Sequence, residues 1–235
     1  MLAYYIHDLS PFLVEFGNGI GLRWYGLAYV LAFAAAYGLF VHLARKGYSD
    51  IRPSDVGDFI TGTALFGVIL GGRLGYMLFY DWTNFSQDPL IFFKFWDGGM
   101  SSHGGILGVA IFTFIYARRK NIPWLNVGDG IVVSTPVGLF LGRCANFING
   151  ELWGRAGDAP WVMWVDGVAR HPTQLYEAAL EGLLVAAVTW WYTARPRPQL
   201  APSGMFLLIY AFGRMTVEFW RMPDAHIGYL YGGWL

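Results

Sequence analysis

Long apolar stretches separated by short polar ones dominate this sequence. A helix needs about 20 consecutive apolar residues to cross the hydrocarbon core of a bilayer. Six stretches have about that length, and we expect each to form a transmembrane helix: 21–44, 56–80, 99–117, 127–148, 173–193 and 203–219. The predicted fold class is therefore an all-α polytopic membrane protein with six transmembrane helices and short interfacial segments on its outer side. We expect residues 1–235 to form a single membrane-embedded domain.

The composition agrees with a membrane location and excludes other classes. Apolar residues make up 55% of the chain and charged residues only 14%, whereas a soluble domain has about 25% charged residues. The net charge is zero and there is no basic tail, so we expect no nucleic-acid partner. The single cysteine, Cys144, permits no internal disulfide and no cysteine-based metal cluster. The histidines lack metal-ligand spacing, so we predict no metal.

The basic residues predict the orientation, because cytoplasmic loops are enriched in Lys and Arg. Half of them follow the first, third and fifth predicted helices: Arg45, Lys46, Arg52, Arg118, Arg119, Lys120, Arg195 and Arg197. Both termini and the two longest connections, 81–98 and 149–172, are then expected on the outer face. Long outer connections indicate substrate capture on that side.

Two outer segments are expected at the membrane surface. Residues 1–18 contain no Lys or Arg and do not have the pattern of a cleavable signal peptide, so we interpret 11–16 as a segment lying in the interface. The aromatic side chains of 89–96 suit the headgroup level, and simple anchoring is their first interpretation.

Charged residues inside the apolar stretches or directly beside them are the candidates for function, since a charge within the membrane costs about 2.5 kcal/mol or more to insert. They are Arg73, Arg143, Arg214, Glu151, Glu177, Glu181 and Glu218. Arg214 and Glu218 are four residues apart and share a helix face with Tyr210. They form either a self-satisfied ion pair or an arginine directed at an anionic ligand.

Arg143 is followed by Asn146, Asn149 and Glu151, which gives a polar cluster near the outer end of its helix. Because a guanidinium binds phosphate with two parallel hydrogen bonds, we expect a lipid-phosphate site there. His103, flanked by Gly104 and Gly105, is either a general base or a hydrogen-bonded interfacial histidine.

Glycines recur at spacing four in the second predicted helix, at Gly67, Gly71 and Gly75. Such repeats of small residues let two helix backbones approach closely. We interpret this repeat as a packing surface.

The stretch Gly142-Arg-Cys-Ala-Asn-Phe-Ile-Asn-Gly-Glu-Leu-Trp-Gly154 resembles the signature of bacterial prolipoprotein diacylglyceryl transferases. Four further stretches share the resemblance and keep its order: 23–26, 98–105, 171–177 and 214–224. The likeness therefore covers nearly the whole chain.

The resemblance implies an enzyme of the bacterial cytoplasmic (inner) membrane with its active site toward the periplasm. Such enzymes move the diacylglyceryl group of phosphatidylglycerol to the lipobox cysteine thiol of a preprolipoprotein, releasing glycerol phosphate without a metal or organic cofactor. By motif, the functional positions are Tyr25, His103, Arg143, Asn146, Glu151, Gly154, Tyr210, Arg214 and Glu218. The family usually has a seventh helix, which is expected to be missing after Leu235.

The residue types suggest a division of roles in that reaction. His103 would deprotonate the substrate thiol, and Arg143 and Arg214 would stabilise charge on the leaving phosphate. Glu151 and Glu218 would hold the two guanidinium groups. A lipid or ion transporter and a structural membrane protein remain alternatives, although we find no internal repeat of the kind typical of transporters.

Overall fold

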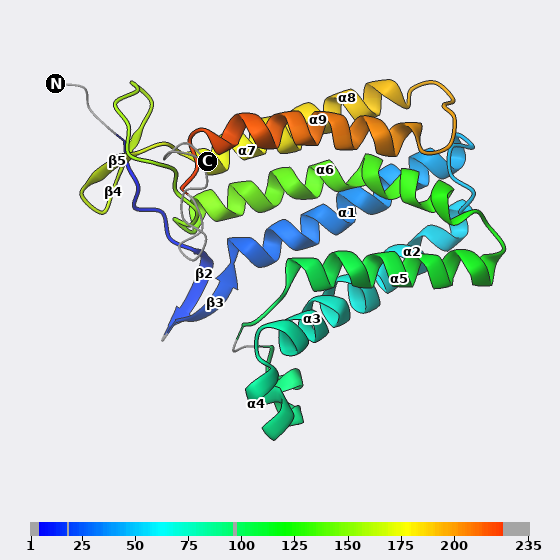
Figure 1. The fold of residues 1–235 in the computed structure, drawn as a ribbon, viewed down its shortest axis with the longest axis horizontal. Helices are drawn as coiled ribbons and strands as arrows, with labels where there is room; N and C mark the ends of the chain where they lie inside the picture. Colours follow the sequence, from blue (N-terminus) through cyan, green and yellow to red (C-terminus); the bar gives the residue numbers. More distant parts are fainter. Residues whose placement is uncertain (1–4, 18, 96–97, 223–235) are drawn as a thin grey trace. The chain divides into compact units, whose positions relative to one another are not determined.

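The structure is a computed structural model that describes residues 5–17, 19–95 and 98–222 (Figure 1). It is mostly helical, and a helix lies at each of the six predicted positions. The chain divides into two compact units: a terminal unit, Met1–Ala36 with Val132–Leu235, and a central unit, Tyr37–Ile131. The last two residues of the motif stretch 214–224 lie outside the described residues.

The helices follow the apolar stretches closely. The first, fourth and sixth predictions correspond to α1 (Trp24–Arg45), α6 (Trp124–Ile148) and α9 (Ala201–Glu218), and the third to α5 (Ser102–Lys120). The second is a continuous run of a 3₁₀ turn (Pro53–Asp55), α2 (Val56–Gly62), a π-helical segment (Thr63–Leu70) and α3 (Gly71–Phe79). The fifth is built from α7 (Thr173–Glu177), a π-helical segment (Ala178–Leu184) and α8 (Val185–Tyr192).

Three of these helices are long and apolar enough to cross a membrane: Trp24–Arg45, Pro53–Phe79 and Trp124–Ile148. The class of a helical membrane protein is thus confirmed. The count of six spans stays a prediction, because the charges inside α9 and the basic end of α5 lower their mean hydropathy.

In the central unit, α3 and the π-helical segment before it pack against α5. A Cβ on Gly71 would lie 2.7 Å from the Gly104 carbonyl oxygen, and one on Gly67 would lie 3.0 Å from the Cα of Val109. The glycine repeat therefore does allow close backbone contact, as predicted from its spacing. A buried cluster closes the other end of this unit: Phe40, Ile51, Val56, Phe59, Ala117 and Val127.

In the terminal unit, α9 packs along the helix formed by α7, the second π-helical segment and α8. Gly182 of the π-helical segment approaches α6 so closely that an added Cβ would be 2.7 Å from the Cα of Phe140. Gly213 of α9 similarly faces the Leu180 carbonyl at 3.1 Å. These small residues bring the polar faces of three helices together.

Short strands were not predicted, and they change two expectations. Residues 11–16 belong to an antiparallel hairpin of β2 (Phe12–Gly17) and β3 (Ile20–Arg23), so the first helix begins at Trp24 rather than at 21. The connection 149–172 contains the hairpin of β4 (Met163–Val165) and β5 (Val168–Arg170), and β1 (Tyr5–Ile6) pairs with β4 in parallel.

The other long connection, 81–98, forms α4 (Trp82–Gln87) and a 3₁₀ helix (Pro89–Phe93). Trp82, Leu90 and Phe93 are exposed there, as expected for side chains at a membrane surface. Trp96 lies outside the described residues.

Candidate functional site

Six charged side chains of the terminal unit form one chain of alternating sign. α6 contributes Arg143, α9 contributes Arg214 and Glu218, the turn after α9 contributes Arg221, and the helix that begins at α7 contributes two glutamates. In order, the chain is Arg214, Glu218, Arg221, Glu177, Arg143 and Glu181.

Glu177 lies at the centre and joins two arginines. Its Oε1 is 2.6 Å from Nη1 of Arg221, and its Oε2 is 3.1 Å from Nε of Arg143. Arg143 also reaches Oε2 of Glu181 through Nη2, at 3.5 Å. Both donors that Arg143 uses are thus on one edge of its planar group, which holds the guanidinium in a defined orientation.

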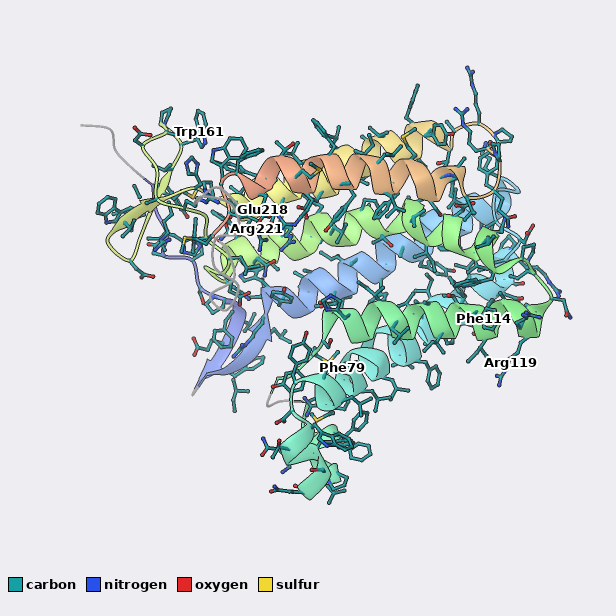
Figure 2. All side chains as sticks on the ribbon, in the orientation of Figure 1. Phe79, Phe114, Arg119, Trp161, Glu218 and Arg221 are labelled. Atoms are coloured by element: carbon teal, nitrogen blue, oxygen red, sulfur yellow. The ribbon has the colours of Figure 1, made fainter. Side chains whose placement is uncertain are left out.

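The other half of the chain is local to α9 and the turn that follows it. Arg214 Nη1 lies 2.5 Å from Glu218 Oε2, which confirms the pair predicted from its spacing of four. Glu218 Oε2 lies 3.6 Å from Nε of Arg221, three residues further on. Glu218 and Arg221 are side by side at the end of α9 (Figure 2).

Two of the three carboxylates are buried more deeply than the arginines, whereas the third, Glu218, is 31% exposed. The side chains of Glu177 and Glu181 are 1% exposed, whereas Arg143 and Arg214 are 22% and 32% exposed. Two buried carboxylates so close together would repel, and the arginine between them offsets that repulsion. The carboxylates form the base of the site, and the guanidinium groups are the part that a ligand can reach.

A second polar cluster surrounds Asn146 on α6, one turn beyond Arg143. The Asn146 amide donates to the Tyr25 hydroxyl at 3.1 Å and to Glu151 Oε2 at 3.0 Å. Asn149 donates to the other Glu151 oxygen at 3.3 Å. The structure therefore brings together Tyr25, Asn146 and Glu151.

The expected pairing of Glu151 with an arginine is wrong. Glu151 is exposed and is held by two amides, while the partners of Arg143 are Glu177 and Glu181. The α7 helix brings those two glutamates against α6, and Gln174 of α7 donates to the Glu151 carbonyl. Glu151 is close to Arg143 in the sequence, but the partners of Arg143 are determined by which helix packs against α6.

Gly154 is buried where three segments meet. Its N–H donates to the His171 carbonyl at 2.9 Å, and an added Cβ would lie 2.6 Å from Cγ2 of Thr173. The next residue, Arg155, donates through Nε to the Arg221 carbonyl at 2.7 Å. Close packing thus requires a glycine here, and the segment supports the main chain of Arg221.

Tyr210 and His103 complete the predicted positions. Tyr210 lies one turn before Arg214 on α9 and stacks on Phe206 with ring centroids 5.8 Å apart. His103 belongs to the central unit, where it is exposed in the first turn of α5, after the cap residue Ser101. Within the described residues, no group of three or more His, Cys, Asp or Glu could hold a metal ion.

The sequence indicated Glu177 and Glu181 as intramembrane charges without a partner for either. Arg221 was not among the predicted site residues. The available signal was spacing: Glu177 and Glu181 are four apart, and Arg221 follows Glu218 by three. Helical spacing places such residues on one face but does not say which helix lies opposite.

The fold and these two clusters define an integral membrane protein with an arginine-lined polar site among its helices. Comparison with known proteins makes this specific. The model of the prolipoprotein diacylglyceryl transferase family matches residues 11–234, and this chain belongs to that family.

Relatives named phosphatidylglycerol–prolipoprotein diacylglyceryl transferase match the whole chain. The protein of Coxiella burnetii (strain RSA 331 / Henzerling II) is 47% identical, covering 100% of this chain and 90% of the relative. That of Oleidesulfovibrio alaskensis is 50% identical, covering 100% and 88%. That of Methylococcus capsulatus is 44% identical, covering 100% and 90%. The resemblance seen in the sequence is thereby confirmed.

Proposed function

We propose that this protein transfers the diacylglyceryl group of phosphatidylglycerol to the lipobox cysteine thiol of preprolipoproteins, the first step of lipoprotein maturation. Family membership supports the reaction, and one structural observation carries it: the guanidinium groups of Arg143 and Arg214 are partly exposed, and Arg143 lies against the buried carboxylates of Glu177 and Glu181. Partly accessible arginines among apolar helices suit the phosphate of a lipid headgroup.

The proposed chemistry is a single displacement. The cysteine sulfur attacks the glycerol carbon that bears the phosphate, and a carbon–sulfur bond forms as the carbon–oxygen bond breaks. The electron pair of the broken bond stays on the phosphate oxygen, so glycerol phosphate leaves with one more negative charge. The thiol proton passes to a base.

Arg143 and Arg214 are assigned to that developing charge. Preorganised donors are most effective in a water-poor site, where no solvent must reorganise during the reaction. Glu177, Glu181 and Glu218 hold the guanidinium groups in place, and they reduce the cost of keeping three arginines close together.

His103 is assigned as the base, because histidine is a common general base at neutral pH and this side chain is exposed. Tyr25 and Asn146 would donate hydrogen bonds to headgroup or glycerol oxygens, with Glu151 orienting Asn146. Gly154 and Tyr210 would line the substrate position.

The proposed setting is the bacterial inner membrane, crossed by six helices in this chain. The basic connections after the first, third and fifth helices would be cytoplasmic. The connections 81–98 and 149–172, and the active site with them, would face the periplasm. Residues 1–235 would act as one membrane-embedded domain.

The test is a transfer assay in vesicles with labelled phosphatidylglycerol and a lipobox peptide. We expect a thioether product with the parent protein and a loss of most activity in Arg143→Lys, because an ammonium cannot replace a planar fork. Arg119→Lys, at the exposed end of α5, is the matched control and should keep full activity. Wild-type turnover by Arg143→Lys would refute the role of Arg143. Movement of intact lipid without thioether would support a transporter instead.

A further inference from the structure

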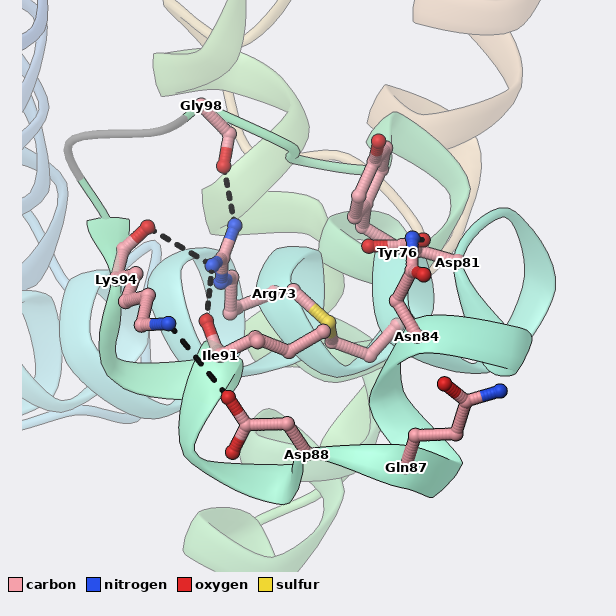
Figure 3. Close-up of a pocket in the computed structure, with 10 residues that line it drawn as sticks. Arg73, Tyr76, Asp81, Asn84, Gln87, Asp88, Ile91, Lys94 and Gly98 are labelled. Atoms are coloured by element: carbon pink, nitrogen blue, oxygen red, sulfur yellow. Dashed lines mark hydrogen bonds and ion pairs between the residues drawn. The ribbon is translucent and has the colours of Figure 1, made fainter.

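Arg73 on α3 is a buried arginine that the proposed reaction does not use. Its side chain donates five hydrogen bonds, all to main-chain carbonyls. Figure 3 shows those to Ile91, Lys94 and Gly98. Nε donates to Phe92 at 2.9 Å, and Nη2 donates to Ile91 at 2.5 Å and Lys94 at 2.9 Å. Nη1 donates to Gly98 and, at 3.0 Å, to Gly99.

A guanidinium has five N–H groups, so each of them has an acceptor here. Arg73 is 2% exposed, and no described carboxylate forms an ion pair with it. Its donors are therefore occupied by the polypeptide and are not open to an anionic lipid. The side chain joins α3 to both described ends of the connection that leads to α5.

The local backbone is shaped for this contact. Gly98 and Gly99 have φ values of +76° and +82°, a region that side chains with a Cβ rarely adopt. A Cβ on Gly99 would also lie 2.9 Å from Nη1 of Arg73. Two successive glycines thus let two consecutive carbonyls face one nitrogen.

Beyond Gly99, α3 also holds the start of α5. The Ser101 N–H donates to the Gly72 carbonyl at 2.9 Å, and the Ser101 hydroxyl accepts from the Gly104 N–H at 3.1 Å. Gly104 packs against Gly75 so closely that an added Cβ would be 2.7 Å from the Gly75 Cα. His103 lies between these two fixed residues, and its side chain is exposed.

The opposite side of the connection is open. A cavity of about 360 Å³ separates Arg73 from α4, and its walls are mostly polar, with Asp88 and Lys94 paired at 3.6 Å (Figure 3). The five hydrogen bonds of Arg73 tie α3 to residues 91–94 and 98–99 beside this cavity.

We infer that Arg73 is a positioning residue: it fixes the entry to α5 and thereby the place of His103. The inference rests on the proposed role of His103 as base, but the tie itself can be measured without activity. Arg73→Lys keeps the charge and loses two of the five N–H donors.

The first measurement is amide hydrogen exchange of Arg73→Lys, read on peptides covering 91–95 and 98–105. We expect exchange at least about 10-fold faster in these peptides and unchanged in α9, since local opening sets exchange rates. Arg119→Lys is the control and should exchange as the parent does. If Arg73→Lys does not accumulate in the membrane, Gly98→Ala replaces it: its Cβ has nothing within 4 Å, and only the backbone is strained.

The second measurement is a double-mutant cycle with His103→Gln. Arg73→Lys should lower kcat about 10- to 100-fold with the KM for phosphatidylglycerol unchanged, since misplacing a catalytic group has effects of that size. In the His103→Gln background, Arg73→Lys should have little further effect.

The two measurements test different parts of the proposal. Unchanged exchange in Arg73→Lys overturns the tie, and fully additive effects in the cycle overturn its action through His103. Full activity of His103→Gln would instead refute the proposed base and would overturn the link from Arg73 to the reaction, while the exchange result still decides whether Arg73 holds the entry to α5.

Discussion

Replacing Glu177 by Gln should disable the site more than any other change to a residue that does not face the ligand. Glu177 bridges Arg221 at 2.6 Å and Arg143 at 3.1 Å while its own side chain is 1% exposed. A glutamine keeps the shape but loses the charge. Its amide NH₂ would also face an arginine N–H, so one of the two contacts becomes donor against donor.

The magnitude follows from burial. Removing one partner of a buried ion pair costs about 3–5 kcal/mol. Arg221 and Arg143 keep 17% and 22% of their side-chain surface exposed, so water can solvate them in part, and the lower end of about 3 kcal/mol applies. Released from Glu177, the Arg143 guanidinium can move by about 1 Å, which is enough to lower turnover by about 100-fold.

The assay is thioether formation in vesicles, with the free energy of unfolding measured in parallel. Glu177→Asp separates charge from geometry: it keeps the charge but is too short to reach both arginines, so we expect an intermediate loss of about 10-fold. Glu15→Gln, on the exposed strand β2, is the matched control and should be unchanged. Parent-like turnover and stability in Glu177→Gln would show that the alternating chain does not position Arg143.

Three further predictions concern packing, pH and the cysteine. Gly104→Ala should destabilise the protein by about 1–3 kcal/mol because its Cβ would overlap the α3 backbone, whereas Gly105→Ala, with nothing closer than 3.9 Å, should be neutral in the same thermal unfolding assay. Burial lowers the pKa of His171 below 6.5, against the opposing charge of Asp158. The folded state thus favours the neutral imidazole; its stabilising effect is complete above pH 6.5 and is lost as the pH falls through the lowered pKa. A pH dependence below 6.5 that is identical in His171→Gln would contradict this. Cys144→Ala should stay active in the transfer assay, since the nucleophile is the substrate thiol; an inactive but folded variant would indicate a covalent enzyme intermediate.

Apolar length predicted the helices well because the requirement of a 30 Å hydrocarbon core acts on every spanning segment alike. It failed at the start of the first helix, where the apolar residues of β3 run directly into α1 at Trp24. Periodicity cannot separate a short apolar strand from an adjoining apolar helix. The two π-helical segments were not predicted either, because they lie within the apolar stretches 56–80 and 173–193 and the apolar pattern does not separate them from the adjoining α-helices.

The site was predictable only where partners share a helix. Arg214 and Glu218 were paired correctly because spacing alone places them on one face. The partner of Arg143 was not, since its choice depends on which helix packs opposite α6. That packing is decided by Gly182, whose missing side chain admits the backbone of Phe140. One glycine in an apolar helix does not identify its neighbour.

The equal number of arginines and glutamates in the alternating chain has a chemical consequence. Arg143 uses Nε and Nη2 for its two carboxylates, and its described contacts leave Nη1 for a ligand. The carboxylates thus orient the donor as well as offsetting its charge. With three charges of each sign, the network is neutral, so the proposed binding of a lipid phosphate would depend on directed hydrogen bonds more than on net charge. A cluster of unpaired arginines would hold the extra negative charge of departing glycerol phosphate strongly and slow its release. In the proposed reaction, pairing every arginine with a carboxylate would favour the transition state, in which the donors are aligned, over tight binding of the product.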